Sequence, residues 1–181
     1  MIYRPEIDGL RAIAVIAIVL FHTEIDAFNK AFIGVDVFFV ISGYLITSII
    51  IKDLDRGTFS LKQFYWRRAR RILPALFLIL IVCTPIAWLL MLPFEFEKYS
   101  QSLIGVNLFV SNIFFWLDSG YFSAAAGWKP LLHTWSLAVK EQFYLFFPVF
   151  LIVMTKFGRR ALVSAIILIA LVSLGLSEWG W

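Results

Sequence analysis

Long apolar runs alternate with short polar or basic connections along this chain. A bilayer has a hydrocarbon core roughly 30 Å thick, which a helix crosses with about 20 mostly apolar residues. On this basis five runs predict membrane-spanning helices. They cover Arg11–Ile25, Phe32–Ile51, Ile72–Met91, Thr134–Thr155 and Ala161–Glu178.

A sixth apolar run, Leu103–Leu117, predicts a different element. It is short and contains Gly105, Asn107, Ser111 and Asn112. Such short runs are typical of re-entrant or interfacial segments. The sequence therefore predicts an all-α polytopic transmembrane helix bundle, with about five spans and one re-entrant or interfacial helix. Residues 1–181 are expected to form a single transmembrane domain.

Composition supports the membrane assignment. Hydrophobic residues make up 61% of the chain and charged residues 15%, whereas soluble domains are about 45–50% apolar and about 25% charged. The net charge of +4 comes from cations clustered beside the apolar runs, a pattern typical of loops that orient a membrane protein. The predicted partner is therefore the lipid bilayer, and no nucleic acid is expected. Cys83 is the single cysteine, and no metal-ligand set is predicted.

The placement of the cations predicts an orientation. If the N-terminus is cytoplasmic and the sixth run does not cross, twelve basic residues fall inside, and only Lys30, Lys98 and Lys129 fall outside. If the sixth run crosses, the basic cluster after the fourth span moves outside. Because cytoplasmic loops carry the excess of Lys and Arg, the first arrangement is favoured. It puts Met1 inside and Trp181 outside.

His22 is the first candidate for catalysis. It follows Arg11 along the first apolar run, and at about 1.5 Å per residue it is expected roughly 16–17 Å further along the helix, inside the membrane. An ionisable group there indicates a functional site. Asp36, on the second span, is expected close enough to orient the imidazole as a general base. The alternative is that His22 and Asp36 merely satisfy one another or lie at a wet interface.

Gly43 lies seven residues after Asp36 and is expected on nearly the same helix face. A small residue there would allow close helix packing or leave room for a ligand.

A basic cluster before the third span is the candidate donor site. Arg68 and Arg71 are three residues apart and share a helix face. Their guanidinium groups match phosphate oxygens, such as those of coenzyme A. The alternative is an ordinary topology signal or a lipid-headgroup contact, which composition by itself favours.

Three polar residues, Lys140, Glu141 and Gln142, interrupt the fourth span. Because charge inside a membrane is costly, these side chains are expected to face the bundle interior or a water-filled cavity. The alternative is that the span begins later and the three residues lie at the outer interface.

Together these stretches resemble the membrane-bound acyltransferase 3 family, particularly the bacterial O-antigen and peptidoglycan O-acetylases. The matching stretches are Asp8–Arg11 with His22 beyond it, Gly34–Gly43, Phe64–Pro74 and Leu131–Leu137. They occur in order over nearly the whole chain.

The resemblance implies an enzyme of the bacterial inner membrane. It would transfer an acyl group, usually acetyl, from cytoplasmic acetyl-coenzyme A to a hydroxyl of a cell-surface carbohydrate. It implies that His22 is catalytic and that Arg68 and Arg71 contact the donor. Arg11 would anchor the donor or stabilise developing negative charge. Acetyl-coenzyme A is then a substrate, with no permanently bound cofactor.

The family domain has roughly ten spans, so the resemblance also implies that residues 1–181 form its N-terminal half. Related proteins often carry a C-terminal SGNH-type domain as well. The family usually has two glutamates where this chain has Lys140 and Glu141, and Glu141 is the candidate substitute for the missing acid. Lys140 leaves open a second reading, a non-catalytic carrier or scaffold that passes acyl groups or lipid-linked glycan to a separate transferase.

Overall fold

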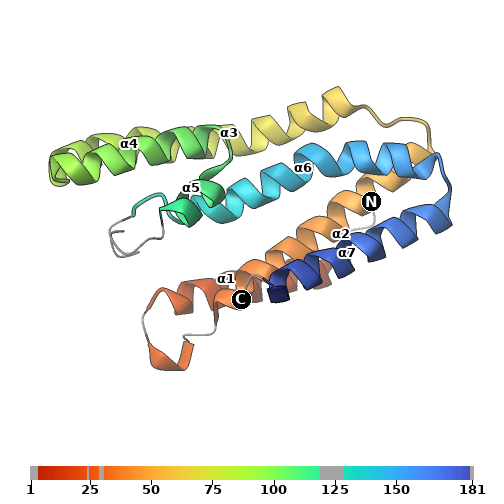
Figure 1. The fold of residues 1–181 in the computed structure, drawn as a ribbon, viewed down its shortest axis with the longest axis horizontal. Helices are drawn as coiled ribbons and strands as arrows, with labels where there is room; N and C mark the ends of the chain where they lie inside the picture. Colours follow the sequence, from red (N-terminus) through yellow and green to blue (C-terminus); the bar gives the residue numbers. More distant parts are fainter. Residues whose placement is uncertain (1–3, 24, 29–30, 119–128, 180–181) are drawn as a thin grey trace.

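A computed structural model describes residues 4–23, 25–28, 31–118 and 129–179. All regular structure in these residues is helical (Figure 1), which confirms the predicted fold class. The elements are α1 (Pro5–Phe21), the 3-10 turns η1 (Asp26–Phe28) and η2 (Ala31–Ile33), α2 (Gly34–Asp55), α3 (Leu61–Leu90), α4 (Pro93–Asn107), α5 (Ser111–Leu117), α6 (Thr134–Thr155) and α7 (Arg159–Trp179).

Four of the described helices are long and apolar enough to cross a membrane: α2 with its preceding turn, α3, α6 and α7. The first predicted span corresponds to α1, which has 17 residues and is displaced toward the N-terminus. Its start is set by Pro5 in the first helical turn, where proline's fixed φ and missing N–H are tolerated. It ends at Phe21, and the backbone N–H of His22 caps the carbonyls of Ile18 and Val19.

The basic segment before the third span is helical, so Arg68 and Arg71 lie one turn apart on α3. Helix α3 begins after Ser60, whose hydroxyl accepts a hydrogen bond from the Gln63 N–H at 3.4 Å. This N-cap satisfies one of the free donors of the first turn. The cap therefore extends the helix through Arg68 and Arg71, ahead of the apolar run.

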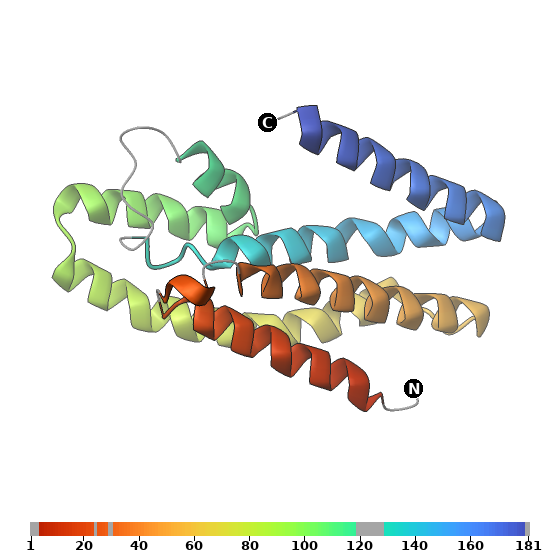
Figure 2. The same cartoon turned by 90° about the horizontal axis from the view of Figure 1, so that it is seen from below.

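Neighbouring helices run mostly in opposite directions (Figure 1, Figure 2). Helix α1 lies antiparallel to α2, whereas α6 lies beside α2 and runs the same way. Helix α7 packs on α6 near the bend that joins them and then diverges, with only Leu162 buried. The basic ends of α3 and α7 and the C-terminal ends of α2 and α6 therefore gather at one end of the bundle. Met1 and Trp181, which define the orientation prediction, lie outside the described residues.

The apolar core has two parts. One joins α3 to α4, α5 and the segment before α6, and is built around Leu80, Tyr99 and Leu131. The other joins α2, α3, α6 and α7, and includes Ile46 and Tyr144. The two parts place α3 and α6 on either side of a shared space, which the α4–α5 hairpin closes.

The predicted sixth run, Leu103–Leu117, folds as a helical hairpin. Helix α4 ends at Asn107, and Phe109, with φ of 54°, turns the chain into α5. The ends are fastened by Asp118, whose carboxylate pairs with Lys98 at 3.1 Å and with Lys129 at 2.8 Å. The segment therefore doubles back on itself, and its re-entrant or interfacial placement in the membrane stays a prediction.

Helices α1 and α2 approach most closely at Gly34. A Cβ atom placed there would lie 2.6 Å from the carbonyl oxygen of Ala14 and 3.0 Å from the Ile18 side chain. Gly43, where the sequence suggested close packing, would place its Cβ in open space. Gly34 therefore sets the register of the first helix pair.

Candidate functional site

A cavity of about 520 Å³ lies between α3, α6 and the turn of the α4–α5 hairpin. Its walls are mostly apolar, but the charged side chains of Arg68 from α3 and Glu141 from α6 line it, together with the Gln142 amide and the hydroxyl-bearing rings of Tyr65 and Tyr144. The prediction that polar residues of the fourth span face the interior is therefore right for Glu141 and Gln142. We take this cavity as the candidate site.

Arg68 is held by aromatic rings. Its Cζ atom lies 4.5 Å from the ring centroid of Tyr144 and 5.7 Å from that of Phe64, and both rings are buried. At the wall of the cavity, the Tyr65 hydroxyl donates a hydrogen bond to the Leu145 carbonyl at 2.7 Å, which links α3 to α6. Cation–π contact orients the guanidinium without consuming its N–H donors, so Arg68 is positioned yet keeps its hydrogen-bonding capacity.

Glu141 faces Arg68 across the cavity. The two side chains interact electrostatically, but no ion pair or hydrogen bond joins them. The Oε1 atom of Glu141 is buried and accepts no hydrogen bond from any described group. Most buried polar atoms have a partner, and an exception calls for an explanation.

Gln142, the next residue, is fully engaged. Its Nε2 donates to the Phe109 carbonyl at 2.8 Å and to Asn112 Oδ1 at 2.9 Å. The Asn112 amide donates back to Gln142 Oε1 at 3.4 Å. This amide pair fastens the hairpin turn to α6. The sequence marked Asn112 and Gln142 separately as polar residues within apolar runs. That shared feature could have suggested that they pair.

The other donor-side candidates lie outside the cavity. Arg71 follows Arg68 by one turn but is exposed. Arg11, on α1, pairs with Asp8 of its own helix at 3.2 Å. The structure thus brings Arg68 and Glu141 together and leaves Arg71 and Arg11 at the surface.

His22 and Asp36 do not meet. His22 caps the end of α1, and both side chains are exposed. Gly34 lies opposite the segment between Ala14 and Ile18, so at about 1.5 Å per residue His22 and Asp36 are roughly 12 Å apart along the axis. The expected pairing placed His22 well inside the first span. In the structure α1 ends at Phe21, and α2 begins alongside the earlier turns of α1, opposite Ala14 and Ile18.

Comparison with known proteins identifies the relationship. The family described as "Acyltransferase domain" matches residues 4–180. The chain belongs to this acyltransferase family. It is 42% identical over 180 residues to "O-acetyltransferase OatA" of Staphylococcus aureus (strain NCTC 8325 / PS 47), a match covering 96% of this chain and 29% of that protein.

A second relative from the same species is "Putative O-acetyltransferase SAS0844" (strain MSSA476), 41% identical over 97% of this chain. The chain spans 30% of that relative's length. No solved structure shows a significant match. The family membership predicted from the four sequence motifs is confirmed.

The structure places the residue that departs from the family pattern. Lys140 Nζ lies 5.3 Å and 5.5 Å from the ring centroids of Phe38 and Phe39 on α2. It therefore faces α2, whereas Glu141 faces α3 and the cavity. In this chain, position 140 contributes to helix packing, and the remaining acid of the pair lies with Arg68.

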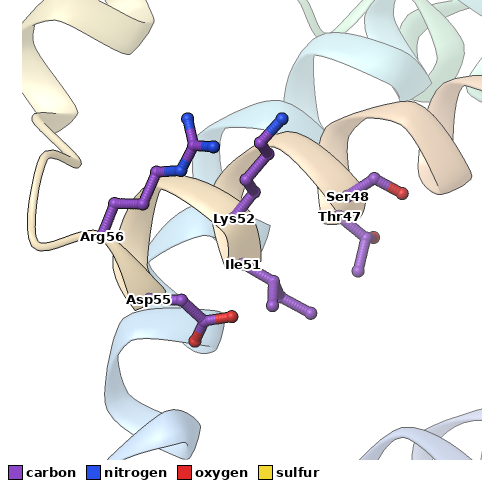
Figure 3. A pocket seen from close by; sticks show the side chains of 6 residues that line it. All are labelled: Thr47, Ser48, Ile51, Lys52, Asp55 and Arg56. Carbon is purple, nitrogen blue, oxygen red and sulfur yellow. The ribbon is translucent and has the colours of Figure 1, made fainter. Parts of the chain in front are cut away.

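A second pocket, of about 490 Å³, lies along the C-terminal part of α2. Lys52 and Arg56 project to one side of the helix, and Thr47, Ile51 and Asp55 to the other (Figure 3). This open basic site has the character of an anionic lipid-headgroup contact. Among the residues that the structure describes, no group of three His, Cys, Asp or Glu side chains could hold a metal ion.

Proposed function

We propose that this chain is part of a membrane O-acyltransferase that moves an acyl group, acetyl in the first instance, from acyl-coenzyme A to a hydroxyl of a cell-surface carbohydrate. The observation that carries the proposal is the cavity in which Arg68 and Glu141 face one another with unused hydrogen-bonding capacity. The names of the relatives, which are O-acetyltransferases, support it.

The donor would bind at the basic end of α3. Guanidinium groups bind phosphate oxygens through paired N–H donors. Arg68, oriented by Tyr144 at the cavity, would hold the donor directly. Arg71, exposed one turn away, would add attraction for the phosphates at longer range.

The acceptor would be activated by His22. A neutral imidazole takes a proton near physiological pH, so His22 would remove the hydroxyl proton as the oxygen attacks the thioester carbonyl. The carbon–sulfur bond would then break, and coenzyme A would leave as its thiol after taking up the proton held by the imidazolium. Asp36 would support this step through its charge. Arg11, roughly 16–17 Å from His22 along α1, would instead anchor the donor.

The separation of the two sites constrains this mechanism. Ile46 of α2 packs in one apolar cluster with Tyr144, and the Tyr144 ring contacts the Arg68 guanidinium. Counting along α2 and α1 at about 1.5 Å per residue puts His22 roughly 25–30 Å from Arg68 along the bundle axis. This is close to the thickness of the hydrocarbon core, roughly 30 Å. The acyl group would therefore have to travel between the ends of the bundle before transfer.

The same separation favours a second candidate function, a carrier that passes acyl groups or lipid-linked glycan to another transferase. Purified full-length protein in proteoliposomes, supplied with radiolabelled acetyl-coenzyme A and a polysaccharide acceptor, discriminates between the two. We expect the label to enter the acceptor as an ester with no other protein present. Label that binds or crosses but enters the acceptor only when a second transferase is added would establish the carrier.

We further propose the bacterial inner membrane as the location, with a cytoplasmic N-terminus and, in the full-length protein, an SGNH-type domain as partner. Single cysteines introduced at Glu97 and Lys156, with Cys83 replaced by serine, test the orientation. Both positions are exposed. An impermeant maleimide added to whole spheroplasts should label position 97 only. Labelling of position 156 alone would reverse the proposed orientation.

A further inference from the structure

Some polar groups of the cavity already make hydrogen bonds within the protein, and others do not. Gln142 uses its amide on Phe109 and Asn112. Arg68 donates no hydrogen bond to a described acceptor, and Glu141 Oε1 accepts none. Among the charged side chains, one donor group and one acceptor atom from facing helices are therefore available within a single cavity of about 520 Å³.

We propose that this cavity binds an amide-bearing segment of the acyl donor, whose carbonyl accepts from Arg68 while its N–H donates to Glu141 Oε1. The inference deepens the proposed function and rests on it. In acyl-coenzyme A the chain between the phosphates and the thioester contains secondary amides, so the donor carries the group that this pair fits.

The charges favour an amide over a phosphate inside the cavity. A phosphate beside Arg68 would also face the Glu141 carboxylate, whose Oε1 atom is buried, and like charges at short range repel each other. An amide is neutral and presents a donor and an acceptor together, so it satisfies both groups without adding charge. Leu108, Val110 and Ile113 supply apolar walls for the methylene groups on either side.

The test uses full-length protein in detergent and three probes: acetyl-coenzyme A, S-acetylpantetheine, which has the amides without the nucleotide, and adenosine 3′,5′-bisphosphate, which has phosphates without the amides. Glu141→Leu should weaken binding of the first two probes about tenfold or more, the scale of one hydrogen bond to a charged group. Binding of the bisphosphate should be unchanged or tighter, because the variant removes a negative charge.

A matched variant separates the hydrogen bond from the charge. Glu141→Gln keeps an acceptor oxygen and should retain most of the affinity for S-acetylpantetheine. If Glu141→Gln loses as much affinity as Glu141→Leu, the carboxylate acts only as the counter-charge of Arg68, and the proposal is overturned. Equal weakening of all three probes by Glu141→Leu would overturn it as well.

A second pair of variants keeps the proposal testable if Glu141→Leu does not fold. Ile113→Trp fills the cavity from α5 and should weaken S-acetylpantetheine binding selectively. Ile104→Trp adds the same ring to an exposed position of α4 and should not. Tight S-acetylpantetheine binding by Ile113→Trp would overturn the proposal. Wild-type protein that binds neither acetylated probe would refute the proposed donor itself, which is a distinguishable result.

Discussion

The α1–α2 pair and the α3–α6 pair hold their candidate residues in opposite ways. In the first pair the backbones touch at Gly34, while His22 and Asp36 are exposed and make no contact with each other. In the second pair the helices stand apart and long side chains fill the space, leaving Arg68 and Glu141 around a cavity. Close packing fixes a register but leaves no room for a ligand, whereas separation supported by an aromatic and amide framework creates one.

The two helix pairs are therefore suited to different steps, ligand binding in the α3–α6 pair and turnover at the α1–α2 pair. A group enclosed by protein is pre-organised for binding, because its orientation is fixed before the ligand arrives. An exposed imidazole at a helix end is accessible to a large acceptor that could not enter the bundle. We therefore expect variants of the first pair to change turnover and variants of the second to change donor affinity.

The largest effect should come from His22. We expect His22→Ala to reduce acyl transfer by the full-length protein by about 10²–10⁴-fold, the usual contribution of a general base, while donor binding is retained. The measurement is turnover of labelled acetyl groups alongside equilibrium binding of acetyl-coenzyme A.

His22→Gln is the matched control, since it keeps hydrogen bonding but cannot act as the base. Near-normal turnover in this variant would remove His22 from the mechanism. Asp36→Asn should lose much less activity than His22→Ala, because Asp36 does not contact the imidazole.

A smaller effect should separate the arginines of α3. Arg68→Ala should weaken acetyl-coenzyme A binding by about 10–100-fold, because charge-assisted hydrogen bonds contribute about 1.5–3 kcal/mol. Arg71→Ala should weaken it less, since an exposed charge is solvated and screened. Isothermal titration of the two variants beside Arg70→Ala, also exposed, provides the comparison. Three equal affinities would leave the cluster with the topology role alone.

The contact that fixes the first pair can be broken by one methyl group. Gly34→Ala would place Cβ 2.6 Å from a backbone oxygen and should destabilise the protein by about 1–3 kcal/mol, as overpacking does. Gly43→Ala adds the same group in open space and should be neutral or stabilising by about 0.5–1 kcal/mol from helix propensity. Thermal unfolding in detergent measures both. Equal stability of the two variants would mean that α1 yields freely against α2.

Sequence reasoning succeeded where one-dimensional pattern determines structure. Apolar length predicted an all-α bundle, and four of the described helices are long and apolar enough to span a membrane. The run Leu103–Leu117, which was set apart from the spans, folds as a hairpin. Sequence reasoning failed where the outcome depends on register between helices. His22 and Asp36 were expected to meet because His22 was placed well inside the first span. In the structure α1 ends just before His22, and α2 begins opposite Ala14 and Ile18.

The same limit applies to the cavity. Nothing in the sequence indicated that the Tyr144 ring would contact the Arg68 guanidinium or that Gln142 would hydrogen-bond Asn112. These partners come from separate helices. Glu141 was identified by its position in a family motif, and its facing of Arg68 emerged only from the fold.

The smallest effect concerns the clasp at the hairpin ends, where Asp118 pairs with Lys98 and Lys129. Burial by itself would raise the pKa of Asp118, but hydrogen bonds from Lys129 and Lys98 outweigh it and hold the pKa below its ordinary value. A carboxyl with a lowered folded-state pKa stabilises the protein at pH values above its unfolded-state pKa, which is about 4 for aspartate. This contribution disappears as the pH falls through the folded-state pKa.

Asp118→Asn should therefore lower thermal stability at neutral pH, by an amount on the order of 1 kcal/mol for a partly exposed ion pair. The difference from wild type should shrink as the pH falls below the unfolded-state pKa and through the lowered folded-state pKa, because the wild-type carboxyl then loses its charge too. Asp55→Asn, at the exposed end of α2, controls for loss of a surface charge and should give a smaller, flatter difference. If the Asp118→Asn deficit persists unchanged in acid, the aspartate stabilises the hairpin by packing, and re-entry of α4–α5 does not depend on this clasp.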